Sequence, residues 1–211
     1  MRSPTALDVF VASPSNLGRE REIIVRACER WNRNTGEELS IIIVPKLWER
    51  DMPATSQRSA QTVINQEILS KCDLLVACFT TSYGTPVGDF GSGTESEIEL
   101  FLKTDKPVIL YFYSGQTSLS DIDPSALQSI NQLKSRYSKT LSYGTFESLE
   151  DLSDALQRDL TMNVRSIIKR IQGSDNSSAL TITGDHNIID DARMTAEEPW
   201  YERSIAGYIL E

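Results

Sequence analysis

Short apolar runs alternate with segments of helical periodicity up to about residue 173. The runs are rich in β-branched and aromatic residues and apolar nearly throughout, which is typical of parallel strands buried on both faces. Four runs are clear and a fifth is weaker, at residues 7–12, 39–44, 73–79, 107–113 and 141–146. Apolar stripes at helical spacing lie around 23–31, 60–68 and 149–171, the last after Ser148 as a candidate N-cap. We therefore predict an α/β fold with an open, doubly wound, mainly parallel five-stranded sheet flanked by helices.

Three loops of this predicted sheet are candidates for a binding site. In such sheets, ligands bind beyond the carboxyl ends of the strands, where the strand-to-helix loops gather. The loops that fall there are 13–18, 45–53 and 80–93. The third is unusually long and carries four glycines. A loop of that length inside a compact domain is commonly functional, so we expect the site to include it.

The pattern changes after Gly173, which divides the chain into an α/β domain (1–173) and a C-terminal region (174–211). Residues 173–178 are predicted to be a polar linker, and 179–190 two short β runs around a Gly-Asp turn. A lone hairpin is marginally stable in water, and the tail at 198–211 is rich in aromatic and aliphatic residues. We expect this region to dock onto another copy of the chain or onto a sensor protein, the alternative being that the tail folds back over its own sheet.

Composition and charge narrow the classes of partner. The formal net charge is −9, with 30 acidic against 21 basic residues, which disfavours nucleic acid as a direct partner. No signal-peptide core and no apolar run of about 20 residues is present, so we expect a cytoplasmic protein with no membrane partner. The three cysteines lie in apolar runs and are predicted to be buried free thiols. His186 is the only histidine, so a zinc site has no support.

Three glutamates, Glu95, Glu97 and Glu99, follow the glycine-rich loop where a helix is predicted to begin. Acidic residues in a first helical turn are stabilised by the helix dipole, each by a few tenths to about 1 kcal/mol. That effect accounts for carboxylates at this place, but it does not account for the glycines before them. On a helix, Glu95 and Glu99 share a face and Glu97 points elsewhere. Glu97 is therefore the candidate that differs from its neighbours.

Several motifs follow one another in a characteristic order and spacing. They are V-F-V-A-S-P-S (9–15), L-W-E-R-D (47–51), C-D-L-L-V-A-C-F (72–79), G-T-x-x-E (93–97) and K-P-V-I-L-Y (106–111). As a set they resemble the nucleoside 2-deoxyribosyltransferases and the related TIR-like domains of bacterial defence systems. The resemblance covers roughly residues 7–112, and its first two motifs strengthen the TIR-like side.

The resemblance implies a role for one of the glutamates. In both families a glutamate at the start of this helix acts on an N-glycosidic bond, and G-T-x-x-E assigns that role to Glu97. A carboxylate suits the chemistry, because breaking a C1′–N bond builds positive charge on the ribose. The transferases usually carry an aspartate two residues before the Gly-Thr pair, where this chain has Gly91, with Asp89 as a candidate substitute. This departure favours the TIR-like, NAD-cleaving interpretation.

Other residues of the three loops are candidates for substrate binding. Backbone N–H groups at Ser13, Ser15 and Asn16 could cradle a phosphate, although a plain helix cap explains them equally well. Arg19 could pair with a pyrophosphate together with Arg21, or both could be solvated. Trp48 could stack on a base or pack in the core. The remaining candidates flank or form the glycine-rich loop and its Gly-Thr pair: Tyr83, Asp89, Phe90, Gly93 and Thr94.

Three functions are compatible with these observations. The first is a TIR-like enzyme of antiphage defence that splits NAD at the nicotinamide–ribose bond and releases ADP-ribose or a cyclic product, with NAD as substrate and no cofactor. The second is cleavage or base exchange of a nucleoside or nucleotide. The third is a non-catalytic TIR-like module that assembles with partners and passes on a signal.

Overall fold

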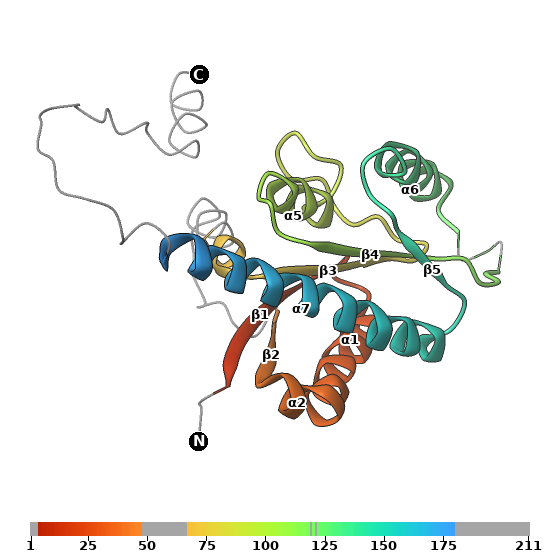
Figure 1. Ribbon diagram of the computed structural model, residues 1–211. Coiled ribbons are helices and arrows are strands. Elements are labelled where there is room, and N and C mark those ends of the chain that lie inside the picture. The colour runs from red at the N-terminus through yellow and green to blue at the C-terminus, as the bar shows by residue number, and fades with distance from the viewer. Residues whose placement is uncertain (1–3, 48–66, 119, 121, 180–211) are drawn as a thin grey trace, which may run out of the picture. The chain divides into compact units, whose positions relative to one another are not determined.

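The computed structural model describes residues 4–47, 67–118, 120 and 122–179, with side chains up to residue 172. Five strands form one parallel sheet in the order β2-β1-β3-β4-β5 (Figure 1). The strands are β1 (Thr5–Ala12), β2 (Ile41–Lys46), β3 (Leu74–Phe79), β4 (Val108–Tyr113) and β5 (Gly144–Phe146). This order is that of the flavodoxin-like doubly wound fold. The predicted fold class is therefore confirmed.

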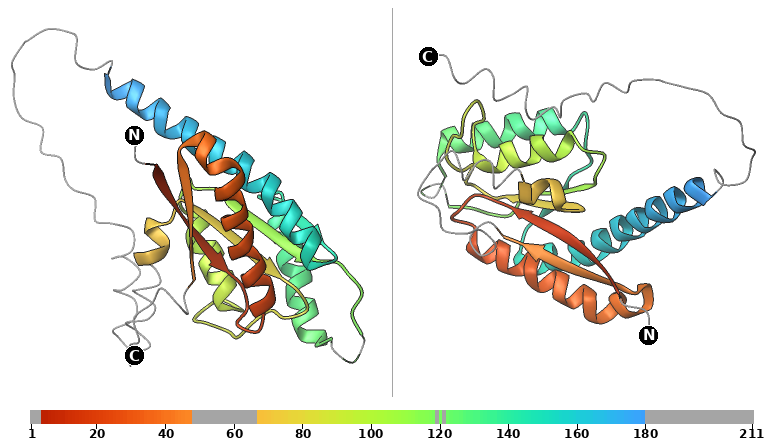
Figure 2. Two further views of the ribbon diagram at one scale, coloured as in Figure 1. Left: turned by 90° about the horizontal axis from the view of Figure 1, so that it is seen from below. Right: turned by 90° about the vertical axis from the view of Figure 1, so that its left-hand side faces the viewer.

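Helices cover both faces of the sheet (Figures 1 and 2). One face carries α1 (Gly18–Trp31) and α7 (Leu149–Ala179), and the other carries α5 (Gly93–Leu102) and α6 (Pro124–Tyr137). A short π-helix, η1 (Asn32–Gly36), and α2 (Glu37–Leu39) lead from α1 into β2. Alternate residues of the central strands face the two layers, so each layer has its own apolar core.

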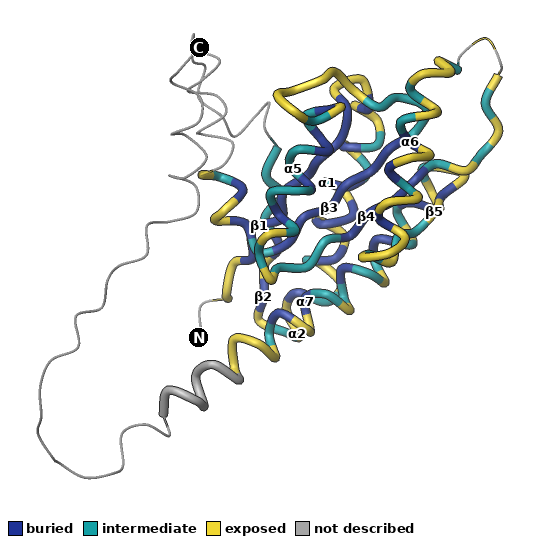
Figure 3. The backbone as a smooth tube through the Cα atoms, turned by 90° about the horizontal axis from the view of Figure 1, so that it is seen from above, coloured by how far each residue is buried: buried dark blue, intermediate teal, exposed yellow. Residues whose placement is uncertain are grey.

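The burial pattern explains why the strands were recognisable from sequence. All six residues of β3 are buried, because it lies in the middle of the sheet with helices on both sides (Figure 3).

Cys28, Cys72 and Cys78 are buried free thiols, as predicted, and burial raises the pKa of each to about 12. Thiols with such a pKa are protonated at neutral pH and behave as core residues.

Two features differ from the predictions. Helix α6 was not expected, although Asp123 accepts a hydrogen bond from Ser125 N–H (2.9 Å) at its N-cap and Pro124 occupies its first turn. Residues 173–178, predicted to be a linker, continue α7 to Ala179 despite a glycine that costs about 1 kcal/mol in a helix. The predicted hairpin, the apolar tail and most of the helix predicted at 60–68 lie outside the described residues.

The chain divides into two units, Met1–Gln172 and Gly173–Glu211. In the part of the chain that the structure describes, no helix is both long and apolar enough to span a membrane.

Candidate functional site

The site is built where the strand order reverses, between β1 and β3. The chain leaves β1 for α1 on one face of the sheet and leaves β3 for α5 on the other, so the two loops diverge at the carboxyl edge. Gly84, in the loop after β3, has a φ of +95°. A Cβ on Gly84 would lie 3.3 Å from the Cβ of Ser92 and 3.8 Å from the Cβ of Pro14. The loop after β1, the loop after β3 and the start of α5 therefore meet at one point.

The loop after β1 is held from inside by Arg21. Its guanidinium is buried and donates to Ser13 Oγ (3.1 Å), to the carbonyl of Pro14 (2.8 Å) and to the carbonyl of Ser15 (2.8 Å). Helix α1 begins after Leu17, with no side-chain hydrogen bond at its cap. The interpretation of Ser13, Ser15 and Asn16 as a plain helix cap is therefore wrong.

Arg19 differs from Arg21 in its surroundings, because it is exposed at the rim of a cavity of about 290 Å³. This cavity opens at the carboxyl ends of β3, β4 and β5, near the first residues of α1 and α7. It is lined by Arg19, Glu20, Thr80, Thr81, Tyr113, Thr117, Phe146, Glu147, Ser148 and Leu149. Ser148 caps α7 as predicted, accepting a hydrogen bond from the N–H of Asp151 (3.1 Å). Hydroxyl groups, two aromatic rings, one arginine and two glutamates, Glu20 and Glu147, give the cavity a mixed lining.

The glycine-rich loop (80–92) leads from this cavity to α5. Ser92 is the N-cap of α5 and accepts a hydrogen bond from the N–H of Glu95 (3.1 Å). Within the loop, Val87 and Phe90 form two reciprocal backbone hydrogen bonds of 3.0 Å. Asp89 is exposed and Phe90 is half-buried, and neither placement tests its predicted role in binding substrate.

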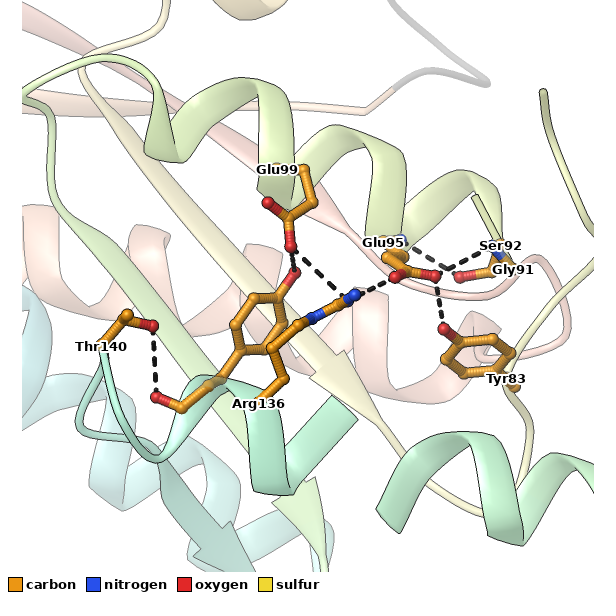
Figure 4. Close-up of polar contacts among 8 residues, drawn as sticks. Tyr83, Gly91, Ser92, Glu95, Glu99, Arg136 and Thr140 are labelled. Atoms are coloured by element: carbon orange, nitrogen blue, oxygen red, sulfur yellow. Dashed lines mark hydrogen bonds and ion pairs between the residues drawn. The ribbon is translucent and has the colours of Figure 1, made fainter. Parts of the chain in front are cut away.

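Glu95 is the most deeply embedded of the three glutamates, with 5% of its surface exposed. Its Oε2 accepts hydrogen bonds from the hydroxyl of Tyr83 and the N–H of Gly91 (2.9 Å), and its Oε1 pairs with the guanidinium of Arg136 (Figure 4). Burial alone would raise its pKa, but the hydrogen bonds from Tyr83 and Arg136, with the charge of Arg136, hold the pKa of Glu95 below its ordinary value. Glu95 is therefore a fixed negative charge.

Glu99 faces the same way, one helical turn further along α5. It accepts a hydrogen bond from the hydroxyl of Tyr137 (2.9 Å) and lies 3.5 Å from the guanidinium of Arg136. Burial, followed by the charge of Glu99, raises the pKa of Tyr137 above its ordinary range. Glu95 and Glu99 thus define a flank of α5 that is joined to α6 by a shared arginine and a tyrosine.

Glu97 lies on the other flank. It is half-buried, and the helical spacing of 100° per residue turns it away from the direction shared by Glu95 and Glu99. Because α5 packs over β1, β3 and β4 while α6 lies on its β4 side, the Glu97 flank faces the β1 side of the sheet. This is the side on which the loops after β1 and β3 diverge.

The glycines of the G-S-G segment are not equivalent. A Cβ on Gly91 would lie 2.6 Å from Cε1 of Tyr83 and 3.2 Å from Oε2 of Glu95, so that position has no room for a side chain. A Cβ on Gly93 would meet Val87 Cγ2 at 3.6 Å, an ordinary contact. Of these two glycines, only Gly91 lacks room for a Cβ within the chain itself.

The sequence missed part of this arrangement. Tyr83, a candidate for substrate binding, donates its hydroxyl to Glu95, and the contacts of Arg136 and Tyr137 with Glu95 and Glu99 were not predicted. Thr94 is buried. Trp48 and the loop beyond residue 47 lie outside the described residues. Within those described, no group of three His, Cys, Asp or Glu side chains could hold a metal ion.

Comparison with known proteins gives a family and distant structural likenesses. No curated protein sequence matches the chain. A conserved protein from Enterococcus faecalis V583 has 13% identity and a TM-score of 0.44 over 74% of this chain and 99% of its own. A 2-desoxiribosyltransferase from Leishmania mexicana has 11% identity and a TM-score of 0.35 over 54% and 69%. A short-chain flavodoxin associated with a PDU bacterial microcompartment has 11% identity and a TM-score of 0.40 over 77% and 99%.

Likenesses at these scores carry no argument about function. The family model is a different kind of evidence, because it matches the sequence itself over residues 8–161, from within β1 to the middle of α7. The chain belongs to the family described as DUF4062, a domain of unknown function.

Proposed function

We propose that this protein cleaves the N-glycosidic bond of a nucleotide, with NAD as the first candidate substrate and Glu97 as the catalytic carboxylate. The observation that carries the proposal is the difference between the three glutamates of α5. Glu95 and Glu99 are engaged with α6, whereas Glu97 lies half-buried on the flank that faces the diverging loops. Of the three, Glu97 has the position from which a carboxylate can face a substrate at the carboxyl edge.

Cleavage of the N-glycosidic bond requires few protein groups other than such a carboxylate. When the C1′–N bond of NAD breaks, the bonding electrons leave with nicotinamide, which departs as a neutral molecule. Positive charge then develops on the ribose, and Glu97 either stabilises it or forms a transient ester at C1′. Water attacks C1′, giving ADP-ribose and one released proton. No acid is needed to protonate the leaving group.

The cavity near Arg19 offers a place for the rest of such a substrate. The exposed guanidinium of Arg19 can pair with a diphosphate, and the hydroxyl groups of Thr80 and Thr81 can bind ribose or phosphate oxygens. Tyr113 and Phe146 supply aromatic rings at the same place, stacked edge to face with centroids 5.5 Å apart. Thr80 and Thr81 begin the loop that leads to α5, and a substrate bound here would have to extend toward α5, which does not itself line the cavity.

The proposal is tested by incubating the purified full-length chain with NAD and, separately, with deoxynucleosides. Chromatography of the released base distinguishes the reactions, and water labelled with oxygen-18 identifies hydrolysis by label in the ADP-ribose product. We expect nicotinamide release that is at least about 100-fold weaker in the Glu97→Gln variant. Base release from deoxynucleosides alone would favour the nucleoside reaction instead. Release of neither base, with the chain dilute or concentrated enough to self-associate, would favour the non-catalytic assembly role.

A role in antiphage defence, and assembly through residues 174–211, belong to the same proposal. Deleting residues 174–211 tests the second part. We expect the truncated chain to melt cooperatively, to form a smaller species in light scattering and to cleave NAD more slowly. A full-length chain that is monomeric under every condition of turnover would contradict an assembly role.

A further inference from the structure

We infer that Tyr83 and Arg136 are positioning residues that hold the glycine-rich loop in place through the carboxylate of Glu95. The part of this inference that concerns turnover rests on the proposed function; the part that concerns the loop does not. Glu95 bridges three segments that are distant in sequence: the loop, through Tyr83 and Gly91; α5, on which it lies; and α6, through Arg136 (Figure 4).

The two carboxylate oxygens of Glu95 accept hydrogen bonds from different segments of the chain. Oε2 accepts both bonds from the loop, one near its beginning (Tyr83) and one near its end (Gly91). Oε1 accepts the bond from Arg136. The Glu95 backbone is itself fixed, because its N–H donates to the capping hydroxyl of Ser92. One carboxylate thus draws together the two ends of the segment between Tyr83 and Gly91.

The segment between those ends also forms hydrogen bonds of its own. Residues 84–89 are exposed, and the hydrogen bonds of Val87 with Phe90 and of Gly93 N–H with the carbonyl of Thr85 (3.2 Å) join the loop to its own residues or to the first residue of α5. Gly91 also has to be glycine because Tyr83 lies against it. The Tyr83–Glu95 contact, by contrast, joins the loop to a side chain of α5 that also binds α6.

Arg136 makes this contact dependent on α6. The arginine side chain is 52% exposed, while that of Glu95 is 7% exposed. If Arg136 moved away, Glu95 would keep its burial and lose its cation, and an unpaired buried carboxylate is unfavourable. If the Glu95 carboxylate then took up water or a proton, the hydrogen bonds that it accepts from Tyr83 and Gly91 would weaken. Movement of α6 would in this way change the contacts of Glu95, which lies two residues before Glu97.

The chain provides a matched control in Tyr137. Its hydroxyl donates to Glu99 in the same way that Tyr83 donates to Glu95, so each Tyr→Phe change removes one tyrosine–carboxylate hydrogen bond at the α6-facing flank of α5. Tyr137, however, lies on α6 and Glu99 on α5, so the bond between them involves no atom of the loop. A general loosening of the helices and a specific release of the loop can therefore be separated.

The test is amide hydrogen exchange of Gly91, whose N–H donates directly to Glu95, read by NMR in the full-length chain. We expect exchange about tenfold faster, or more, in Tyr83→Phe and Arg136→Gln, the scale of losing one hydrogen bond to a charged group. Arg136→Lys should restore part of the protection, and Tyr137→Phe should leave Gly91 unchanged. Unchanged exchange in Tyr83→Phe, or equal acceleration in Tyr137→Phe, would overturn the inference.

Turnover gives a second readout where cleavage is detected. We expect Tyr83→Phe to lower kcat while leaving KM within about twofold, because the loop would be misplaced over α5 while the cavity near Arg19 is unaltered. If the chain cleaves no nucleotide, the proposed function fails and the exchange of Gly91 still decides the role of the loop contact. If cleavage is present and Gly91 exchange is unaltered, the positioning role fails alone.

Discussion

On the flank of α5 that faces α6, Glu95 and Glu99 each accept a tyrosine hydroxyl and share one arginine; Glu97 is half-buried on the opposite flank, toward the β1 side of the sheet. The three residues have the same side chain and lie within two turns of one helix. Glu95 and Glu99 are tied to α6 by these contacts and therefore join the two helices. The direction of the side chain therefore distinguishes Glu95 and Glu99, which have structural contacts with α6, from Glu97, the proposed catalytic residue.

The largest effect is expected from Glu97→Gln, which keeps size and polarity but removes the charge. Turnover of NAD should fall at least about 100-fold, the scale of losing one electrostatic stabiliser in a transition state. The matched change Glu99→Gln, on the other flank, should cost less than about tenfold. Comparable losses from the two changes, measured as kcat/KM, would remove the distinction between the flanks.

The two glycines before the helix sharpen the comparison through stability. Gly91→Ala should lower the free energy of unfolding by about 1–3 kcal/mol, because its Cβ would overlap the ring of Tyr83 and crowd Glu95. Gly93→Ala meets only an ordinary contact with Val87 and should cost less than about 1 kcal/mol. Urea denaturation measures both. Equal losses of unfolding free energy in the two variants would show that Gly91 is not packed closely against Tyr83 and Glu95.

The charge of Glu95 should appear in the pH dependence of stability. Its pKa is lowered in the folded state, so its contribution is complete above the unfolded pKa of about 4.3 and is lost as the pH falls through the lower folded value. Glu95→Gln removes this contribution and should be less stable than the wild type at pH 6 by about 1–2 kcal/mol. We expect the difference to shrink between pH 5 and pH 3. A difference that stays constant over that window would mean that Glu95 is not a fixed charge.

The smallest effect is expected from Arg19→Ala at the cavity. Loss of one exposed guanidinium should raise KM for NAD by about threefold to tenfold with kcat little changed, because a solvent-exposed contact to a diphosphate contributes modestly to binding. Arg26→Ala is a suitable control, since Arg26 lies on the same helix in an exposed pair with Glu22. An unchanged KM in Arg19→Ala would place the diphosphate elsewhere.

The fold could be predicted from the sequence because its signal is local. Each buried strand is a continuous apolar run, and the long stripe of α7 keeps its period for six turns. Helix α6 was missed because Leu127, Ile130 and Leu133 are separated by serine, glutamine and asparagine, although Asp123 and Pro124 are a recognisable helix start. The continuation of α7 past Gly173 was likewise hidden by a polar, glycine-containing composition.

The site could be predicted only in part, for a related reason. Helical spacing alone separates Glu97 from Glu95 and Glu99, and it needs no knowledge of the tertiary structure. The partners of Glu95 depend on a loop that turns back onto the helix and on an arginine 41 residues away. No local pattern in the sequence connects Arg136 with Tyr83. The contact of Tyr83 with Glu95, and the crowding that excludes a side chain at Gly91, therefore could not be predicted from the sequence.

The most direct test of the account is a crossed comparison of Glu95→Gln and Glu97→Gln, with turnover of NAD and the free energy of unfolding measured on the same preparations. We predict that Glu97→Gln loses at least about 100-fold in turnover with stability within about 0.5 kcal/mol of the wild type. Glu95→Gln should lose about 1–2 kcal/mol of stability and keep a larger share of turnover. The reverse pattern, with Glu95→Gln inactive but stable and Glu97→Gln active, would contradict the assignment of the catalytic carboxylate to Glu97.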